Sequence, residues 1–301
     1  MNIGRGESGT YVQGAATTPG PGPAHPDWTT GMPALDRLLD GVHAGDNIVW
    51  QVDAIDDYQA LVGPFARAAL QAGRPLVYFR FASHDALLPE DCGAQIVRPN
   101  PAAGFEGFVI QVHRAIDATG RHGAYVLDCL SQLASIWSAD QMLGNFFLLT
   151  CPRLHESGSV SYLGLQRNYH ASFAMHPVTE TAEFLLDVFR HEGQRYVRPI
   201  KVQHRSPASS CTIHRWNGQE FRPLTDSAEL AELMAFSGWP GLRADTLVGF
   251  WRRIFHEAQQ THDDVQAGRC GPECEREVFE RLSRMVLSRD EADVHGSVKA
   301  K

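Results

Sequence analysis

The chain has 301 residues, of which 43% are hydrophobic and 21% are charged, an ordinary composition for a globular protein. Its net charge of −8 and the lack of a Lys/Arg stripe argue against binding of nucleic acid or of anionic membranes. We see no membrane-helix run and no secretory signal, and six cysteines are too few for a disulfide scaffold, so we expect a cytoplasmic protein with reduced thiols.

Residues 1–26 are rich in Gly, Pro, Thr and Ala and contain few apolar side chains, which predicts a disordered tail. From Trp28 on, a domain is expected that extends over residues 27–226. Its first part alternates short apolar runs with segments of helical spacing. The apolar runs predict strands at 47–50, 76–81, 124–127 and 160–165. The helical spacing predicts a short helix with Leu35, Leu38 and Leu39, and longer ones at 58–72, 105–119 and 140–154.

This alternation predicts an α/β fold, a doubly wound and mainly parallel sheet with helices on both faces. The later strands are close together in sequence, and Asn217-Gly218 is a hairpin signal, so we expect an antiparallel extension at one edge. These strands are predicted at 183–190, 195–204, 211–216 and 220–223. Beyond them we expect a helical hairpin over 240–292 and a flexible tail at 293–301.

Three stretches carry a resemblance to KaiC-like members of the RecA superfamily. They are the Thr-Gly and Leu-Asp motif of residues 30–39, the segment 124–131 with Asp128 at a strand end, and the late hairpin of residues 198–205. The segments 45–53, 143–152 and 221–227 also resemble the N-terminal region of large phosphoenolpyruvate-synthase-like proteins. In those proteins the region precedes ATP-grasp and phosphohistidine domains, and the hairpin is similar to their connector. The resemblance implies a RecA/KaiC-like fold.

A working phosphate loop needs glycines, a Lys for the phosphates and a Ser or Thr for magnesium. The place for it is directly after the first strand, at residues 51–59, which contain no Gly, Lys, Ser or Thr. Three carboxylates stand there instead, on Asp53, Asp56 and Asp57, and they would repel a triphosphate. We therefore expect a degenerate loop and no ATP hydrolysis by the P-loop mechanism.

Other parts of the resembled machinery are also altered. The acidic residue expected after the second strand comes late, as Asp85, and the late Lys-x-Arg becomes Lys201-Val202-Gln203 with Arg205 displaced. Asp128 alone fits its expected role, although a turn carboxylate at a strand end explains it as well. The ATP-grasp block and the phosphohistidine segment are not found, so we expect no enzyme, no cofactor and no metal.

The loop after the fourth strand contains Arg167, Asn168, His170 and His176, and ligands of open sheets bind at such loops. A solvated loop is the plainer interpretation. The residues that we consider for ligand binding are Asp53, Asp128, Arg167, Asn168, His170 and Lys201. No Gly-x-Ser-x-Gly elbow is present, which argues against a serine hydrolase of that type. Cys270 and Cys274 have a permissible gap for zinc but lack a second pair, so we interpret them as ordinary thiols.

The leading hypothesis is a non-catalytic, KaiC-like accessory or regulatory domain, with a phosphoenolpyruvate-synthase-like protein as its partner. RecA relatives form rings, so a homo-oligomer is a further expectation. A second hypothesis is a sensor that binds a nucleotide or another small molecule without hydrolysis through Asp128, Arg167 and His170. A third is a metal-dependent enzyme that uses the carboxylates of Asp53, Asp56, Asp57 and Asp128.

Overall fold

The computed structural model describes residues 28–203, 212–236 and 256–282, the last range without 272, 275 and 279. The predicted N-terminal tail, the tail at 293–301 and Arg205 lie outside the described residues. So does the first part of the predicted hairpin, residues 240–255, and its last part, residues 283–292. Within the hairpin, residues 256–266 are helical, as are the described members of 273–282.

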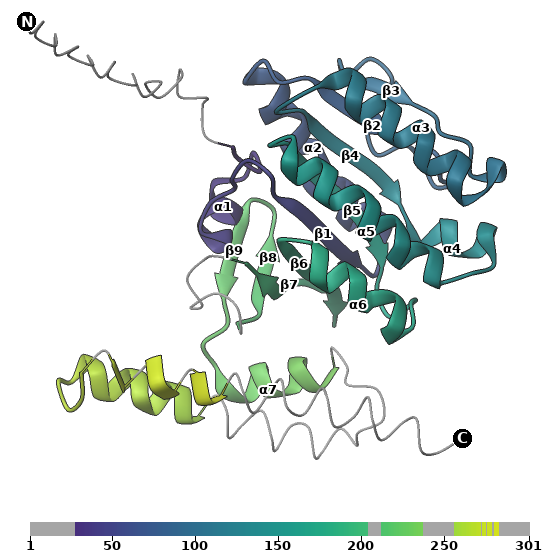
Figure 1. Ribbon diagram of the computed structural model, residues 1–301. Coiled ribbons are helices and arrows are strands. Elements are labelled where there is room, and N and C mark those ends of the chain that lie inside the picture. The colour runs from purple at the N-terminus through teal and green to yellow at the C-terminus, as the bar shows by residue number, and fades with distance from the viewer. Residues whose placement is uncertain are drawn as a thin grey trace, which may run out of the picture.

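The strands of the described chain form one mixed sheet in the order β3-β2-β4-β5-β1-β6-β7-β8-β9 (Figure 1). Strands β3 to β6 in this order pair in parallel, and β6 to β9 pair antiparallel. The prediction of a parallel core with an antiparallel edge is thus confirmed. The bounds are β1 (Asn47–Val52), β2 (Leu76–Phe79), β3 (Gln95–Val97), β4 (Ala124–Cys129), β5 (Val160–Gln166), β6 (Phe184–His191), β7 (Gln194–Val202), β8 (His214–Asn217) and β9 (Glu220–Pro223).

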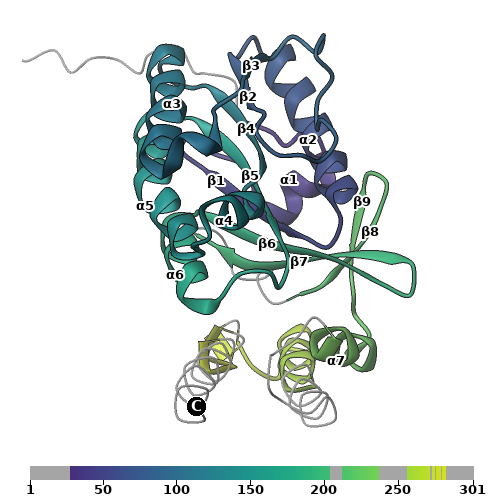
Figure 2. The ribbon, with the colours of Figure 1, turned by 90° about the vertical axis from the view of Figure 1, so that its right-hand side faces the viewer.

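Helices cover the two faces of the sheet unequally, and Figure 2 shows the sheet between the two helical layers. One face carries α1 (Pro33–Leu39) and α2 (Ile55–Gln71). The opposite face carries α3 (Gly104–Thr119), α4 (Ser131–Trp137), α5 (Gln141–Glu156) and α6 (Ser172–Thr181). A 3₁₀ turn, Pro101–Ala103, precedes α3. No helix in the described part of the chain combines the length and the apolar character needed to cross a bilayer.

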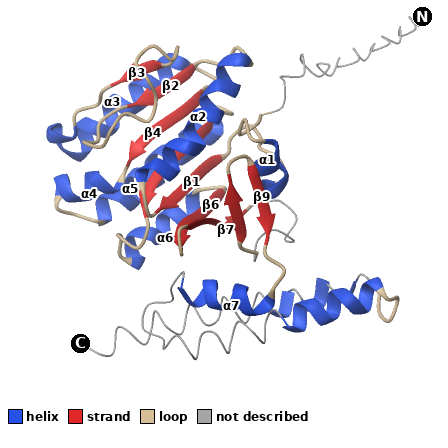
Figure 3. Cartoon of the chain, turned by 180° about the vertical axis from the view of Figure 1, so that it is seen from behind, coloured by secondary structure: helices blue, strands red, loops and turns tan. Residues whose placement is uncertain are grey.

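The central strands are apolar on both sides because both of their faces are covered. Along β4, for example, Val126 packs toward α2 while Tyr125 and Leu127 pack toward α3 and α5. Aromatic rings fill the α2 side, where Phe65 stacks on Tyr162 at 4.1 Å between ring centroids. The central strands β1, β2, β4 and β5, among those drawn in red in Figure 3, are therefore buried on both faces, whereas the edge strands β3 and β9 are more exposed.

The Thr-Gly and Leu-Asp motif has a structural explanation. The Asp36 carboxylate accepts hydrogen bonds from the Thr30 N–H at 2.7 Å and from the Thr29 hydroxyl at 2.5 Å, which fixes the start of α1. Gly31 has φ +75°, and a Cβ there would lie 2.2 Å from the carbonyl oxygen of Pro64 in α2. A glycine is needed because any side chain would push α2 away from the turn.

A third group of apolar side chains lies at the antiparallel edge, where α7 (Ser227–Phe236) follows β9. Phe189 and Tyr196, from β6 and β7, contact Leu230 and Met234 of α7 in this group, and Leu282 of the C-terminal segment joins it. The structure thus extends the antiparallel edge with a helix that the sequence analysis does not predict.

Candidate functional site: the carboxyl end of β1

The site is centred on the carboxyl end of β1, which lies between β5 and β6 in the sheet. From β1 the chain passes to α2 on one face, whereas from β5 it passes to α6 on the opposite face. Ligands of open α/β sheets bind where neighbouring strands send the chain to opposite faces in this way. This is also the place where the sequence analysis looks for a phosphate-binding loop.

The connection from β1 to α2 is short. β1 ends at Val52 and α2 begins at Ile55, so only Asp53 and Ala54 lie between them. A phosphate loop of the form GxxxxGK[ST] needs about eight residues to surround the phosphates with N–H groups. The structure instead continues the strand and starts the helix within residues 51–59. Two residues are too few to form a cradle for a triphosphate.

An ion pair closes the α2 side of this position. Asp57 is fully buried in the first turn of α2, and both of its oxygens accept hydrogen bonds from Arg190, each at 2.8 Å. Arg195 lies 3.7 Å from the same carboxylate. The hydrogen bond to Asp57 raises the pKa of Arg190, so its guanidinium is held in the charged state. A bidentate pair of this kind is both strong and geometrically specific.

A second group of charges lies on the opposite side of the sheet. The buried Asp187 of β6 accepts a hydrogen bond from Arg167 Nε at 2.8 Å and one from Arg198 Nη2 at 3.0 Å. Asp53 lies between the two groups, because it is 3.5 Å from Arg167 Nη1 and accepts the backbone N–H of Arg190 at 3.0 Å. We refer to these seven residues together as the ion-pair network: Asp53, Asp57, Asp187, Arg167, Arg190, Arg195 and Arg198.

The network changes the electrostatic expectation for residues 51–59. Asp53 and Asp57 do not stand as unpaired negative charges, since arginines from β6 and the β5–α6 loop neutralise them. Asp56 is exposed to solvent and is not a member of the ion-pair network. Steric closure by the short connection and the paired side chains therefore matters more at this position than carboxylate repulsion.

Asp128, at the end of β4, is the acid that matches the resembled ATPases. Its carboxylate is fully buried and accepts hydrogen bonds from Tyr78 at 2.5 Å, Arg80 at 2.7 Å and the N–H groups of Phe81 and Ala82, each at 2.8 Å. Burial and the bond to Asp128 raise the pKa of Tyr78, so the phenol stays protonated and donates. In this arrangement Asp128 ties the segment after β2 to the end of β4, as a turn carboxylate would.

The remaining candidates occupy other places. His170 bonds Ser131 and Asp140, neither of which is among the hydrogen-bond donors to Asp128. Asn168 is exposed in a left-handed conformation with φ +55°. His176, expected in a loop, lies within α6. The residues proposed for a sensor, Asp128, Arg167 and His170, thus belong to three separate hydrogen-bonded groups.

Lys201 lies at the other end of the sheet. It pairs with Leu185 near the amino end of β6, and its ammonium donates to the carbonyl of Thr179 at 2.6 Å at the end of α6. Burial lowers its pKa. The structure therefore separates Lys201 from Asp53 and gives it the role of a helix C-terminal partner within this chain.

The carboxylates proposed for a metal are likewise engaged. Asp53 and Asp57 contact arginines, and Asp128 accepts from Tyr78 and Arg80. In the described ranges no three His, Cys, Asp or Glu side chains are arranged to hold a metal ion. Cys270 and Cys274 are free thiols, and their mutual hydrogen bond raises the pKa of Cys270 to about 11.

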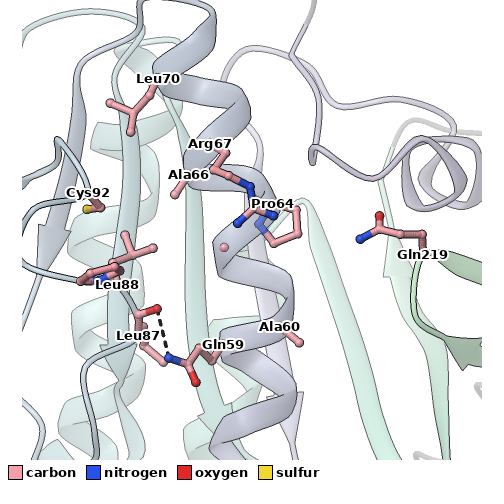
Figure 4. A pocket seen from close by; sticks show the side chains of 12 residues that line it. Gln59, Ala60, Pro64, Ala66, Arg67, Leu70, Leu87, Leu88, Cys92 and Gln219 are labelled. Carbon is pink, nitrogen blue, oxygen red and sulfur yellow. Dashed lines mark hydrogen bonds between the residues drawn. The ribbon is translucent and has the colours of Figure 1, made fainter.

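A groove lies on the outer side of α2 and has a volume of about 560 Å³. Figure 4 shows α2 between Leu87 and Leu88 of the segment after β2 on one side and Gln219 of the β8–β9 turn on the other, with Gln59 turned toward Leu87. Gln59 donates to the Leu87 carbonyl at 3.5 Å across it. None of the residues that line the groove belongs to the ion-pair network.

Fold and site together define an α/β protein with a mixed sheet whose central switch point is occupied by its own side chains. Comparison with models of known protein families finds no family that matches the chain, and comparison with curated proteins finds no match either.

Proposed function

We propose that this chain is a degenerate KaiC/RecA-like domain that does not hydrolyse ATP and acts as an accessory or regulatory domain. Its partner is a phosphoenolpyruvate-synthase-like phosphotransferase. The proposal rests on the motifs of the sequence, on the α/β fold with an acid at the end of β4, and on the closed switch point beside β1.

The single observation that carries the loss of hydrolysis is the two-residue connection from β1 to α2 with the Asp57–Arg190 pair behind it. A triphosphate at this position would have to displace Arg190 from a buried carboxylate. Breaking a buried ion pair costs about 3–5 kcal/mol, and the half-exposed Arg190 reduces this figure. No Lys stands in the connection to offset that cost.

The accessory role is tested with a purified phosphoenolpyruvate-synthase-like enzyme from the same genome. We expect the two proteins to elute together on size exclusion, and the chain to change the rate at which the enzyme forms its product. An enzyme that elutes alone, and whose rate is the same with and without the chain, contradicts the proposal.

The loss of ATP hydrolysis can be tested without the partner, by assaying the ATPase activity of two variants of this chain. Arg190→Met removes the closing side chain from the switch point, whereas Arg153→Met removes an exposed arginine that pairs with Asp117 on the α3–α5 surface. We expect neither variant to gain ATP hydrolysis, because the connection from β1 to α2 stays two residues long in both.

A further inference from the structure

A serine, a histidine and an aspartate form a hydrogen-bonded line at the carboxyl ends of β4 and β5. Ser131 is the first residue of α4, separated from the end of β4 by one residue, and its Oγ lies 2.7 Å from His170 Nε2 in the loop after β5. His170 Nδ1 bonds the Asp140 Oδ1, and the backbone N–H of Ala171 donates to Asp140 Oδ2 at 2.7 Å. This is the arrangement in which a nucleophile contacts a base and a third group orients that base.

The hydrogen bonds fix where the protons lie. The Asp140 carboxylate can only accept, so His170 Nδ1 donates to it. The backbone N–H of Gln166 donates to Ser131 Oγ at 2.8 Å, and the serine hydroxyl donates to the free lone pair of His170 Nε2. His170 Nε2 is then an acceptor, and the ring carries its proton on Nδ1, facing the Asp140 carboxylate. A histidine in this tautomer can act as a general base toward Ser131.

Ser131 is buried, and the exposed Tyr169 lies against its partner His170. Ser131 is 2% exposed, whereas Tyr169 is 48% exposed and its ring packs edge-on against His170 at 5.0 Å between centroids. Its hydroxyl bonds that of the exposed Ser135 of α4 at 2.6 Å, so Tyr169 joins the loop after β5 to α4. A side chain held by one exposed hydrogen bond can rotate away without disturbing the core.

We propose that Ser131 is an activated nucleophile that accepts acyl groups from small carboxylic esters, with His170 as its base, Asp140 as a positioning residue and Tyr169 as a movable cover. This activity is independent of the proposed accessory function, because it uses no member of the ion-pair network.

The reaction needs only the ester, water, Ser131 and His170. Ser131 Oγ forms a bond to the ester carbonyl carbon while its proton moves to His170 Nε2, and the leaving alkoxide takes that proton as the carbon–oxygen bond breaks. Water then attacks the acyl-serine, gives its proton to Nε2, and the proton returns to Ser131 Oγ as the carboxylic acid leaves.

The test uses the full chain with two probes, p-nitrophenyl acetate and diisopropyl fluorophosphate. We expect diisopropyl fluorophosphate to leave one diisopropylphosphoryl group per chain, with loss of fluoride, as seen by intact mass and mapped to Ser131 by peptide sequencing, and we expect slow release of p-nitrophenol from the ester. Tyr169→Ala is expected to raise the labelling rate about tenfold, since it removes the cover. Ser131→Ala is expected to remove labelling, and His170→Gln to lower its rate about 100-fold, the usual contribution of a general base.

Ser172→Ala is the matched control, because Ser172 is an exposed serine two residues beyond His170. Its labelling is expected to equal that of the unaltered chain. If neither the unaltered chain nor Tyr169→Ala is labelled, or if the label maps to another residue, the proposal is wrong. These two results do not depend on whether the Ser131 and His170 variants fold, and far-ultraviolet circular dichroism checks the folding of each variant.

Discussion

Asp57 and Arg190 differ in how much each needs the other. Asp57 is fully buried, whereas the Arg190 side chain is 47% exposed and can be hydrated without its partner. Replacing Arg190 by Met leaves a buried carboxylate with Arg195 at 3.7 Å as its nearest cation. We expect Arg190→Met to lower the free energy of unfolding by about 1–3 kcal/mol, measured by urea denaturation.

The reciprocal change should be milder. Asp57→Asn keeps a side-chain oxygen that can accept one hydrogen bond, and Arg190 can turn to water, so a loss of about 1 kcal/mol is expected. The account requires the arginine variant to be the less stable of the two. The opposite order in urea would show that Asp57 is not the buried, dependent member of the pair.

His214 makes stability depend on pH. Burial lowers the pKa of this side chain below its ordinary value of 6.5, while its Nδ1 contacts the Thr212 carbonyl at 3.1 Å. The unfolded chain then binds more protons than the folded one, so stability rises with pH up to about 6.5 and falls below it. We expect His214→Gln to reduce the dependence of stability on pH between about pH 5 and 7, as measured by thermal unfolding. The control is the same change at the exposed His43, which we expect to leave the pH dependence of stability unchanged.

At the scale of the elements, two glycines give opposite predictions. A Cβ on Gly164 of β5 would lie 2.6 Å from the ring of Tyr58, whose hydroxyl donates to the Leu127 carbonyl of β4. Gly164→Ala is therefore expected to lower stability by about 1–3 kcal/mol through overpacking.

Gly63 lies within α2 with only the end of Arg67 near an added Cβ, at 3.5 Å, so Gly63→Ala should raise stability by about 0.5–1 kcal/mol. Thermal unfolding of the two variants decides, and equal effects would contradict the packing of α2 on β5.

Long periodic elements are the part of the fold that the sequence predicts well. The strands β1, β2, β4 and β5 and the helices α2, α3 and α5 fall close to their expected ranges, because each has an uninterrupted apolar pattern. Short elements escape this method. β3 has three residues at the sheet edge, and α4 has only seven residues and is separated from β4 by one residue.

From the sequence, His170 and His176 are expected in a loop, whereas the structure forms α6 over Ser172–Thr181, even though Pro177 inside it disfavours a helix interior. Tertiary packing decides otherwise. α5 approaches so closely that a Cβ on Gly144 would lie 2.9 Å from Pro177 Cγ, and Val178 of α6 is fully buried. Contacts between two helices, which no local pattern contains, stabilise this element.

The residues of the site also depend on tertiary contacts that no local sequence pattern contains. The sequence identifies residues 51–59 as lacking a phosphate loop, but Arg190 comes more than 130 positions after Asp57. Only the pairing of β1 with β6 brings the two side chains together. The Ser131 and His170 line was missed for the same reason, although both residues follow strands whose carboxyl ends meet at one edge of the sheet.

At the scale of the whole molecule, the ion-pair network joins the parallel core to the antiparallel edge. Asp53 and Asp57 belong to the β1–α2 connection and α2, Arg167 follows β5, and Arg195 and Arg198 lie on β7. Side chains from both halves of the sheet thus meet where a ligand of this fold class would bind. A chain arranged in this way uses its switch point to hold its own halves together.

The most direct test of this account is a calorimetric titration of the full chain with ATP and magnesium. A switch point filled by its own side chains predicts no saturable binding below about 1 mM, which corresponds to less than about 4 kcal/mol of binding free energy. A dissociation constant in the low micromolar range, lost when Asp128 is changed to Asn, would show that a nucleotide does occupy the carboxyl end of β1.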